Sequence, residues 1–229
     1  MNTDEAVAIT ESFIDQAARD RVTVTGADAQ SYLQSQIAQE IRDLPIGAGR
    51  WTLVLDPTGK IDAIARIQRT GEDVYVLDTD AGFGEVLLAR INRFKIRVDA
   101  ETRLDLAEQE QASSEHEQSR IEAGWPKMGA EIEPGSTIPA TTGVVGVAVN
   151  FQKGCYPGQE LVERMDSRGA DAPKALRIVD LDDRDTVGSP VLDGDGAEVG
   201  AVTSVGNSGT GLAYVKRGVD VGRAPLALQ

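Results

Sequence analysis

Two side chains with reactive chemistry occur only once each in the 229 residues, Cys155 and His116. Cys155 lies in the segment 153–160, Lys-Gly-Cys-Tyr-Pro-Gly-Gln-Glu, whose two glycines and one proline predict a constrained loop. Residues 161–165 can continue this loop as a helix, so the thiol precedes a helix N-terminus and lies two residues from Lys153. Both features favour the thiolate, although a lone cysteine is also often a small buried hydrophobe.

The counts of cysteine and histidine exclude several kinds of site. One cysteine cannot form an internal disulfide, and one cysteine with one histidine cannot supply the four nitrogen and sulfur ligands of a structural zinc site. A Ser-His-Asp or Cys-His site would have to use His116. Residues 107–120 around it are rich in Glu, Gln and Ser, a composition typical of a solvated helix or connector. We therefore expect His116 on the surface, whereas the residues alone leave Cys155 as either a reactive thiol or a small buried hydrophobe.

The charge of the chain restricts its partners. It carries 23 Lys and Arg against 37 Asp and Glu, a formal charge of −14. Because nucleic-acid phosphates repel a net anion, we expect no direct nucleic-acid partner. Residues 1–8 lack the basic and apolar regions of a secretory signal, and no apolar run approaches the roughly 20 residues of a membrane span. With a single thiol, the sequence favours a soluble cytoplasmic protein without a membrane partner.

The elements around these residues follow from hydrophobic periodicity. Alternation predicts strands, and three-to-four-residue spacing predicts helices at 33–44 and 83–94. The strands are expected at 21–24, 51–55, 61–67 and 74–77, and a further strand is expected to begin with Ile96 and Val98. Asp56-Pro57-Thr58-Gly59 predicts a tight turn. This β-α-β-β-β-α-β order predicts an α+β fold with an antiparallel or mixed sheet covered by helices, and no glycine-rich nucleotide-binding motif follows a strand.

The last part of the chain has a different pattern. Gly124 and Pro126 predict the end of a helix that begins before residue 120. After Pro173, short strands at 175–181, 198–205 and 211–215 alternate with Gly- and Asp-rich turns, and Asp193-Gly194-Asp195-Gly196 predicts a hairpin connection. About 57 residues of this kind suit a small β-barrel. We therefore predict two domains, residues 1–172 and 173–229.

The loop motif, continued by Arg164 and by Arg168-Gly169, resembles the signature of YgfZ-type proteins. These are folate-binding proteins related in fold to the T-protein (aminomethyltransferase) of the glycine cleavage system. The resemblance covers most of the chain, and further matching segments lie at 22–29 with 32–36, 56–60, 120–126 and 200–204.

The resemblance implies a T-protein-like fold around a folate pocket, with tetrahydrofolate or a derivative as cofactor. It implies an accessory, non-enzymatic or weakly enzymatic role in assembling or repairing iron–sulfur clusters, with iron–sulfur proteins or their assembly factors as partners and tRNA-modifying enzymes among the beneficiaries. Cys155 is then the functional thiol, for redox exchange or transient contact with a cluster or sulfur donor, since permanent ligation needs about four thiolates. Supporting residues would be Lys153, Gly154, Tyr156, Gly158, Gln159, Glu160, Arg164 and Arg168, with Asp62 and Tyr156 facing folate.

Two departures from the family leave alternatives open. The stretch between Val98 and Ile121 is much shorter than the αβ subdomain that normally supplies part of the folate-facing wall, and the Tyr-x-Gly-Glu segment of the T-protein has no counterpart. The hairpin carries Asp62 beside Ala63 where the T-protein has an acidic pair. The alternatives are a tetrahydrofolate-dependent aminomethyltransferase and a degenerate scaffold without a ligand.

Each supporting residue also has a purely structural interpretation. Tyr156 could simply pack, Glu160 could stabilise the helix dipole, and Asp62 could be a strand-surface carboxylate. Arg164 and Arg168 could lie on a solvated helix face. Trp51 and Trp125 are expected in the core.

Overall fold

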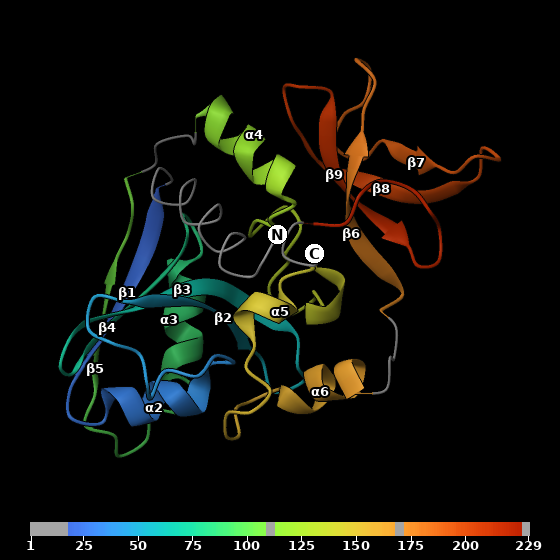
Figure 1. Cartoon of the computed structure of the whole chain (residues 1–229). Coiled ribbons are helices and arrows are strands. Elements are labelled where there is room, and N and C mark those ends of the chain that lie inside the picture. The colour runs from blue at the N-terminus through green and yellow to red at the C-terminus, as the bar shows by residue number, and fades with distance from the viewer. Residues whose placement is uncertain (1–17, 109–112, 168–171, 226–229) are drawn as a thin grey trace.

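Two antiparallel sheets organise residues 18–108, 113–167 and 172–225, the parts that the computed structural model describes (Figure 1). The first sheet has the strand order β2-β3-β4-β1-β5 and the second β6-β9-β8-β7. The strands are β1 Arg19–Thr25, β2 Gly49–Leu55, β3 Ile61–Gly71, β4 Val74–Asp80, β5 Glu101–Asp105, β6 Lys174–Asp180, β7 Pro190–Leu192, β8 Glu198–Val205 and β9 Thr210–Lys216. The helices are α2 Ala29–Gln36, α3 Gly84–Asn92, α4 Ser114–Ala123, α5 Val145–Ala148 and α6 Gln159–Ser167, with a 3-10 turn η1 Pro139–Thr141. The predicted α+β class is confirmed.

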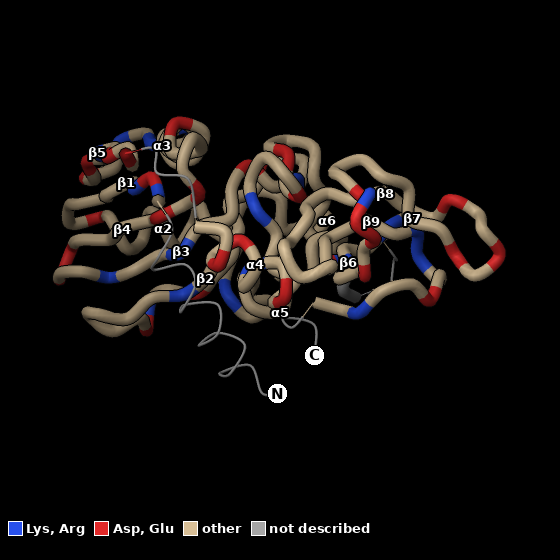
Figure 2. Tube along the Cα trace, turned by 90° about the horizontal axis from the view of Figure 1, so that it is seen from above, with Lys and Arg blue, Asp and Glu red and all other residues tan. Residues whose placement is uncertain are grey.

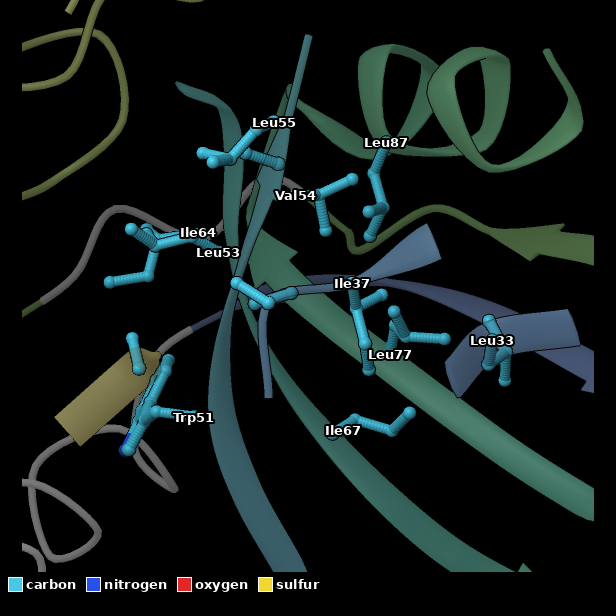
Figure 3. Packing of buried hydrophobic residues seen from close by; sticks show 14 of the residues in the cluster. Leu33, Ile37, Trp51, Leu53, Val54, Leu55, Ile64, Ile67, Leu77 and Leu87 are labelled. Carbon is cyan, nitrogen blue, oxygen red and sulfur yellow. The ribbon is translucent and has the colours of Figure 1, made fainter. Parts of the chain in front are cut away.

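The main core lies between the first sheet and the helices α2 and α3. Figure 3 shows Leu33 of α2 and Leu87 of α3 close to strand residues that include Val54 and Leu77. All four side chains are fully buried, and burial of such a side chain contributes roughly 1.5–3 kcal/mol. Trp51 and Trp125 also lie in this core, with ring centroids 4.7 Å apart, as expected.

Three local expectations were wrong. The helix at 33–44 ends at Gln36, because Ala38 donates its N–H to Leu53 O and accepts one from Asn150 N, so tertiary hydrogen bonds replace the helical ones. Residues 96–98 form no strand, since Arg97 has a left-handed φ of 57° and pairing with β1 begins at Glu101. His116 is buried in α4, whose inner face packs on the body, and is not on the surface.

The second sheet has its own small core of valines and Ala213. The predicted hairpin forms between β7 and β8, where Asp193 Oδ1 accepts the N–H groups of Asp195 (3.0 Å) and Ala197 (2.9 Å). Within the described residues β6 and β7 remain the two edges of an open sheet, so the predicted closed barrel is not confirmed.

A largely buried polar cluster of Arg120, Glu131, Thr203 and Ser204, here the α4 cluster, joins α4 and the segment after it to β8 of the second sheet. Arg120 Nη1 lies 3.0 Å from Glu131 Oε2, and its Nη2 donates to Ser204 Oγ at 2.8 Å. Glu131 Oε1 accepts from Ser204 Oγ at 2.6 Å and from Thr203 Oγ1 at 2.7 Å. Gly124 ends α4 with a φ of 68°, as its sequence predicted. The C-terminal sheet is thus fastened to α4, which Figure 1 shows beside it.

Across the described ranges, no helix combines the length and apolar character that a membrane span requires.

Candidate functional site

The motif loop, residues 153–158, packs directly against the turn between β2 and β3. A Cβ on Gly158, whose φ is 81°, would lie 2.5 Å from Asp56 O. A Cβ on Gly59, whose φ is 89°, would lie 2.4 Å from Leu161 Cβ in α6. Both positions therefore require glycine for its left-handed backbone and for the close approach.

The predicted turn at Asp56–Gly59 is confirmed. The Asp56 carboxylate accepts the N–H groups of Thr58 at 2.8 Å and Lys60 at 2.9 Å, and the Thr58 hydroxyl at 2.8 Å. Burial acts to raise the pKa of Asp56, but these hydrogen bonds outweigh it and lower that pKa. These hydrogen bonds hold the turn in one conformation, against which the motif loop packs.

A cavity of about 540 Å³ opens between this turn and α6. The thiol-bearing residue Cys155 is exposed and lines it. The other lining residues are Pro57, Thr58, Tyr156, Pro157, Gly158, Gln159, Glu160, Leu161 and Arg164. Six of the predicted site residues therefore meet at one cavity, and Pro57 and Thr58 join them from a segment about 100 positions earlier in the chain.

Lys153 anchors the motif loop to the body. Its Nζ donates to the main-chain oxygens of Gln34, at 2.6 Å, and Ile37, at the end of α2. It also lies 5.2 Å from the ring centroid of Tyr156. Burial lowers the pKa of Lys153 to about 8, although the Glu40 carboxylate acts to raise it. The ammonium group is engaged by carbonyl oxygens, and its predicted effect on the thiol stays a prediction.

Some of the remaining motif residues pack within the loop, and others are exposed on α6 or in the loop. Gln159 Oε1 accepts the N–H of Tyr156 at 2.9 Å and so closes the loop onto the start of α6. Tyr156 is buried, and its hydroxyl has no hydrogen-bond partner among the described residues. Burial, with the charge of Glu163, raises its pKa to about 12. Glu160 and Arg164 are exposed on α6. Gly154 is exposed in the loop, and Arg168 lies outside the described residues.

Asp62 lies at the start of β3, apart from the residues that line the cavity. Its carboxylate is 3.8 Å from Nε of Arg90, and 18% of its side chain is exposed. Burial and then the charge of Asp56 raise the pKa of Asp62, against the opposing effect of Arg90 and Arg93. Asp62 is therefore a half-buried acid next to a buried base.

Arg90 is the residue that sequence reasoning missed. Its Nε donates to Leu55 O at 2.5 Å and its Nη1 to Gln36 Oε1 at 3.2 Å, while Nη2 is buried without a hydrogen-bond partner among the described residues. Burial lowers the pKa of Arg90, although Asp62 acts to raise it. Its position three residues after Leu87, on the apolar face of α3, was the available signal.

Sequence comparisons give relatives of one kind. No family model matches the chain. It is 26% identical over 229 residues to an uncharacterized protein of Haemophilus influenzae, a match covering 81% of each chain. It is 25% identical over 214 residues to the tRNA-modifying protein YgfZ of Shigella sonnei, covering 65% of each. A stretch of 87 residues is 39% identical to YgfZ of Cronobacter sakazakii, covering 34% of this chain and 26% of the relative.

Among solved structures, the chain is similar to the glycine cleavage system aminomethyltransferase T from Bartonella henselae. The TM-score is 0.73 at 15% sequence identity, over 91% of this chain and 81% of that one. The protein therefore has the fold of the T-protein class. Within that class its sequence relatives make it a T-protein-like fold of the YgfZ type, and the alignment spans about two thirds of the Shigella relative.

Proposed function

We propose that this protein is a folate-binding accessory factor that supports iron–sulfur enzymes, tRNA-modifying enzymes among them, through the thiol of Cys155. The observation that carries this proposal is the exposed Cys155 at a 540 Å³ cavity built by the motif loop and the β2–β3 turn. The YgfZ relatives are described as tRNA-modifying proteins, which supports the role in tRNA modification.

The chemistry proposed for Cys155 is transient. A thiolate can exchange with a disulfide, or make a short-lived bond to a cluster iron or a sulfur donor presented by a partner. A single thiolate cannot hold a cluster that takes about four. In this proposal Lys153 and Gln159 hold the loop, and Gly158 allows its close approach to the β2–β3 turn. The partners are iron–sulfur proteins or their assembly factors.

The surroundings of Asp62 and Tyr156, the residues proposed to face folate, contain buried polar atoms that a reduced pterin could satisfy by hydrogen bonding. Arg90 Nη2 beside Asp62 and the Tyr156 hydroxyl are buried polar atoms without hydrogen-bond partners among the described residues. Such groups carry a free-energy cost until a ligand satisfies them. A bound tetrahydrofolate would supply ring nitrogens and the pterin carbonyl oxygen as acceptors for these hydrogen bonds.

The aminomethyltransferase alternative is not favoured. Its support was the shared fold, and at 15% identity the likeness to the T-protein shows the fold alone.

We place the protein in the cytoplasm and retain the division into residues 1–172 and 173–229 as part of the proposal.

Complementation tests the role of the thiol. In a bacterial host that lacks its own YgfZ-type protein, the full chain should restore the activity of a cluster-dependent tRNA-modifying enzyme. Cys155→Ser should abolish that restoration. Asp195→Asn, an equally exposed change in the distal hairpin, should retain it. Circular dichroism and thermal melting would verify that both variants fold. Full complementation by Cys155→Ser would refute the assignment of the thiol.

Equilibrium titration tests the folate part separately. The purified chain should bind tetrahydrofolate saturably, and Asp62→Asn should weaken this binding because the amide cannot accept as a carboxylate does. The absence of saturable binding would instead favour the degenerate scaffold without a ligand.

A further inference from the structure

A basic segment, Arg93-Phe94-Lys95-Ile96-Arg97, connects the end of α3 to β5. It places three cations within five residues of a chain whose formal charge is −14. Along the rest of the trace Lys and Arg positions are interspersed with more frequent Asp and Glu (Figure 2). In the described parts of the chain, no carboxylate forms a salt bridge with Arg93, Lys95 or Arg97. The segment therefore presents three cations that form no ion pair within the described residues.

The shape of this segment is fixed rather than loose. Two guanidinium groups lie over the Phe94 ring, with that of Arg90 5.3 Å and that of Arg93 5.6 Å from the ring centroid. Arg97 has a φ of 57°, the left-handed conformation that side chains other than glycine rarely adopt. Ile96 is 76% exposed and Phe94 41% exposed. Strained backbone together with exposed apolar and cationic side chains is a combination that marks functional surfaces more often than structural ones.

The basic segment begins three residues after Arg90, which lies beside Asp62, a residue proposed to face folate. Arg90 contacts both the basic segment and Asp62. Its guanidinium group lies over the ring of Phe94, and its Nε is 3.8 Å from the Asp62 carboxylate. Arg93 is close enough for its charge to act on the Asp62 carboxyl group. A ligand held at Asp62 would therefore meet the cations of this segment if it extended past α3.

We propose that the basic segment binds the poly-γ-glutamate tail of a reduced folate. This inference rests on the proposed folate function. Each added γ-glutamyl unit carries one carboxylate, the group that guanidinium binds with paired hydrogen bonds. The two methylenes of each unit suit contact with Ile96 and Phe94. A nucleic acid is the less fitting occupant, because three cations on a net anion give little phosphate binding and an exposed isoleucine adds none.

The test compares two ligands by equilibrium titration of the full chain, monoglutamyl and pentaglutamyl tetrahydrofolate. Wild type should bind the pentaglutamyl form on the order of tenfold more tightly at low salt, as expected for a few exposed ion pairs. The triple variant Arg93→Ala/Lys95→Ala/Arg97→Ala should bring the ratio of the two dissociation constants to about 1. A control of equal charge change, Arg184→Ala/Lys216→Ala/Arg217→Ala on exposed positions of the C-terminal sheet, should keep the wild-type ratio.

Salt gives a second readout that needs no variant. Raising the NaCl concentration from 0.05 to 0.5 M should reduce the wild-type preference for the longer tail, because exposed ion pairs are screened. Equal affinity of wild type for both ligands, or a preference that persists in the triple variant, would overturn the inference while leaving folate binding intact. If neither ligand binds saturably, the folate part of the proposed function fails, and this inference fails with it.

Discussion

The motif loop and the α4 cluster both bury a cation, and they treat it in opposite ways. Burial alone acts to lower the pKa of Arg120, but the carboxylates of Glu131 and Glu117 outweigh this effect and raise it. Lys153 binds main-chain carbonyls instead, and burial lowers its pKa to about 8. The difference lies in the partner, since a carboxylate compensates a desolvated charge and a carbonyl dipole does so only in part.

This comparison separates a structural cluster from a candidate site. In the α4 cluster, Glu131 is enclosed and each of its carboxylate oxygens accepts hydrogen bonds. In the motif loop, Lys153 and Gly158 hold the backbone while Cys155 is left exposed at a cavity. We expect the first region to control stability, and the second to control the reactivity of the thiol.

Removing Glu131 should produce the largest effect. Glu131→Ala leaves the charge of Arg120 buried without its principal partner, and breaking a buried pair in this way costs about 3–5 kcal/mol. Urea denaturation should show this loss, while the rate at which iodoacetamide alkylates Cys155 in the folded protein stays near that of wild type. Glu133→Ala, an exposed neighbour, should change stability by less than about 0.5 kcal/mol. A loss below about 1 kcal/mol for Glu131→Ala would contradict the structural role of the cluster.

Two glycines with nearly the same φ provide the next test. Gly59→Ala combines left-handed strain with a Cβ 2.4 Å from Leu161 Cβ, and should cost about 2–4 kcal/mol. Gly47→Ala has a φ of 87° but nothing within 4 Å of the new Cβ, so it should cost only about 1–2 kcal/mol.

The two glycine variants should also differ at the thiol. Gly59→Ala forces α6 away from the turn and should change the alkylation rate of Cys155, whereas Gly47→Ala should not. If both variants lose the same stability and leave alkylation unchanged, the contact between the turn and α6 does not position the loop.

A smaller effect is expected from Lys153. The folded protein holds the proton of Lys153 less tightly than the unfolded chain does, because its pKa falls from 10.5 to about 8. The unfolded state then binds more protons between these values, so the free energy of unfolding rises with pH from about 8 to about 10.5. Lys153→Met should lack this rise. Urea denaturation of both proteins at several pH values would give the difference between their free energies of unfolding, which should change between about pH 8 and 10.5. Parallel curves for the two proteins would contradict the lowered pKa.

The smallest effect concerns His116, on the α4 side of the comparison. Burial lowers its pKa, against the opposing charge of Glu117. Below its ordinary value of 6.5 the unfolded chain binds the proton and the folded chain does not, so stability falls with decreasing pH in that range. His116→Gln should flatten this part of the profile. An unchanged profile would mean that the burial of His116 has no cost.

The sequence predicted those elements that depend on nearest neighbours. The turn at Asp56–Gly59 and the helix end at Gly124 follow from residues that favour one local conformation whatever surrounds them. The strands of both sheets were predicted from alternation, except β5 and the short β7. In the same way, the two glycines and one proline of the motif marked the loop that carries Cys155.

Long-range contacts decided the rest. The apolar spacing from Leu33 to Leu44 predicts one helix. Ala38, however, donates its N–H to Leu53 O and accepts the N–H of Asn150, and the helix ends after Gln36. The polar composition of residues 107–120 predicted an exposed His116. His116 is buried because the inner face of α4 packs on the rest of the protein. Periodicity reports which residues are apolar, and it contains no information on which distant backbone groups they meet.

For the candidate site the same division holds. The sequence alone determined that one thiol exists, that it lies in a constrained loop and that a helix follows it. Only the tertiary structure brought Pro57 and Thr58 to that thiol, turned Lys153 toward α2, and placed Arg90 beside Asp62. These contacts join residues between 28 and 119 positions apart, and they form because burying the shared core brings the backbone groups together.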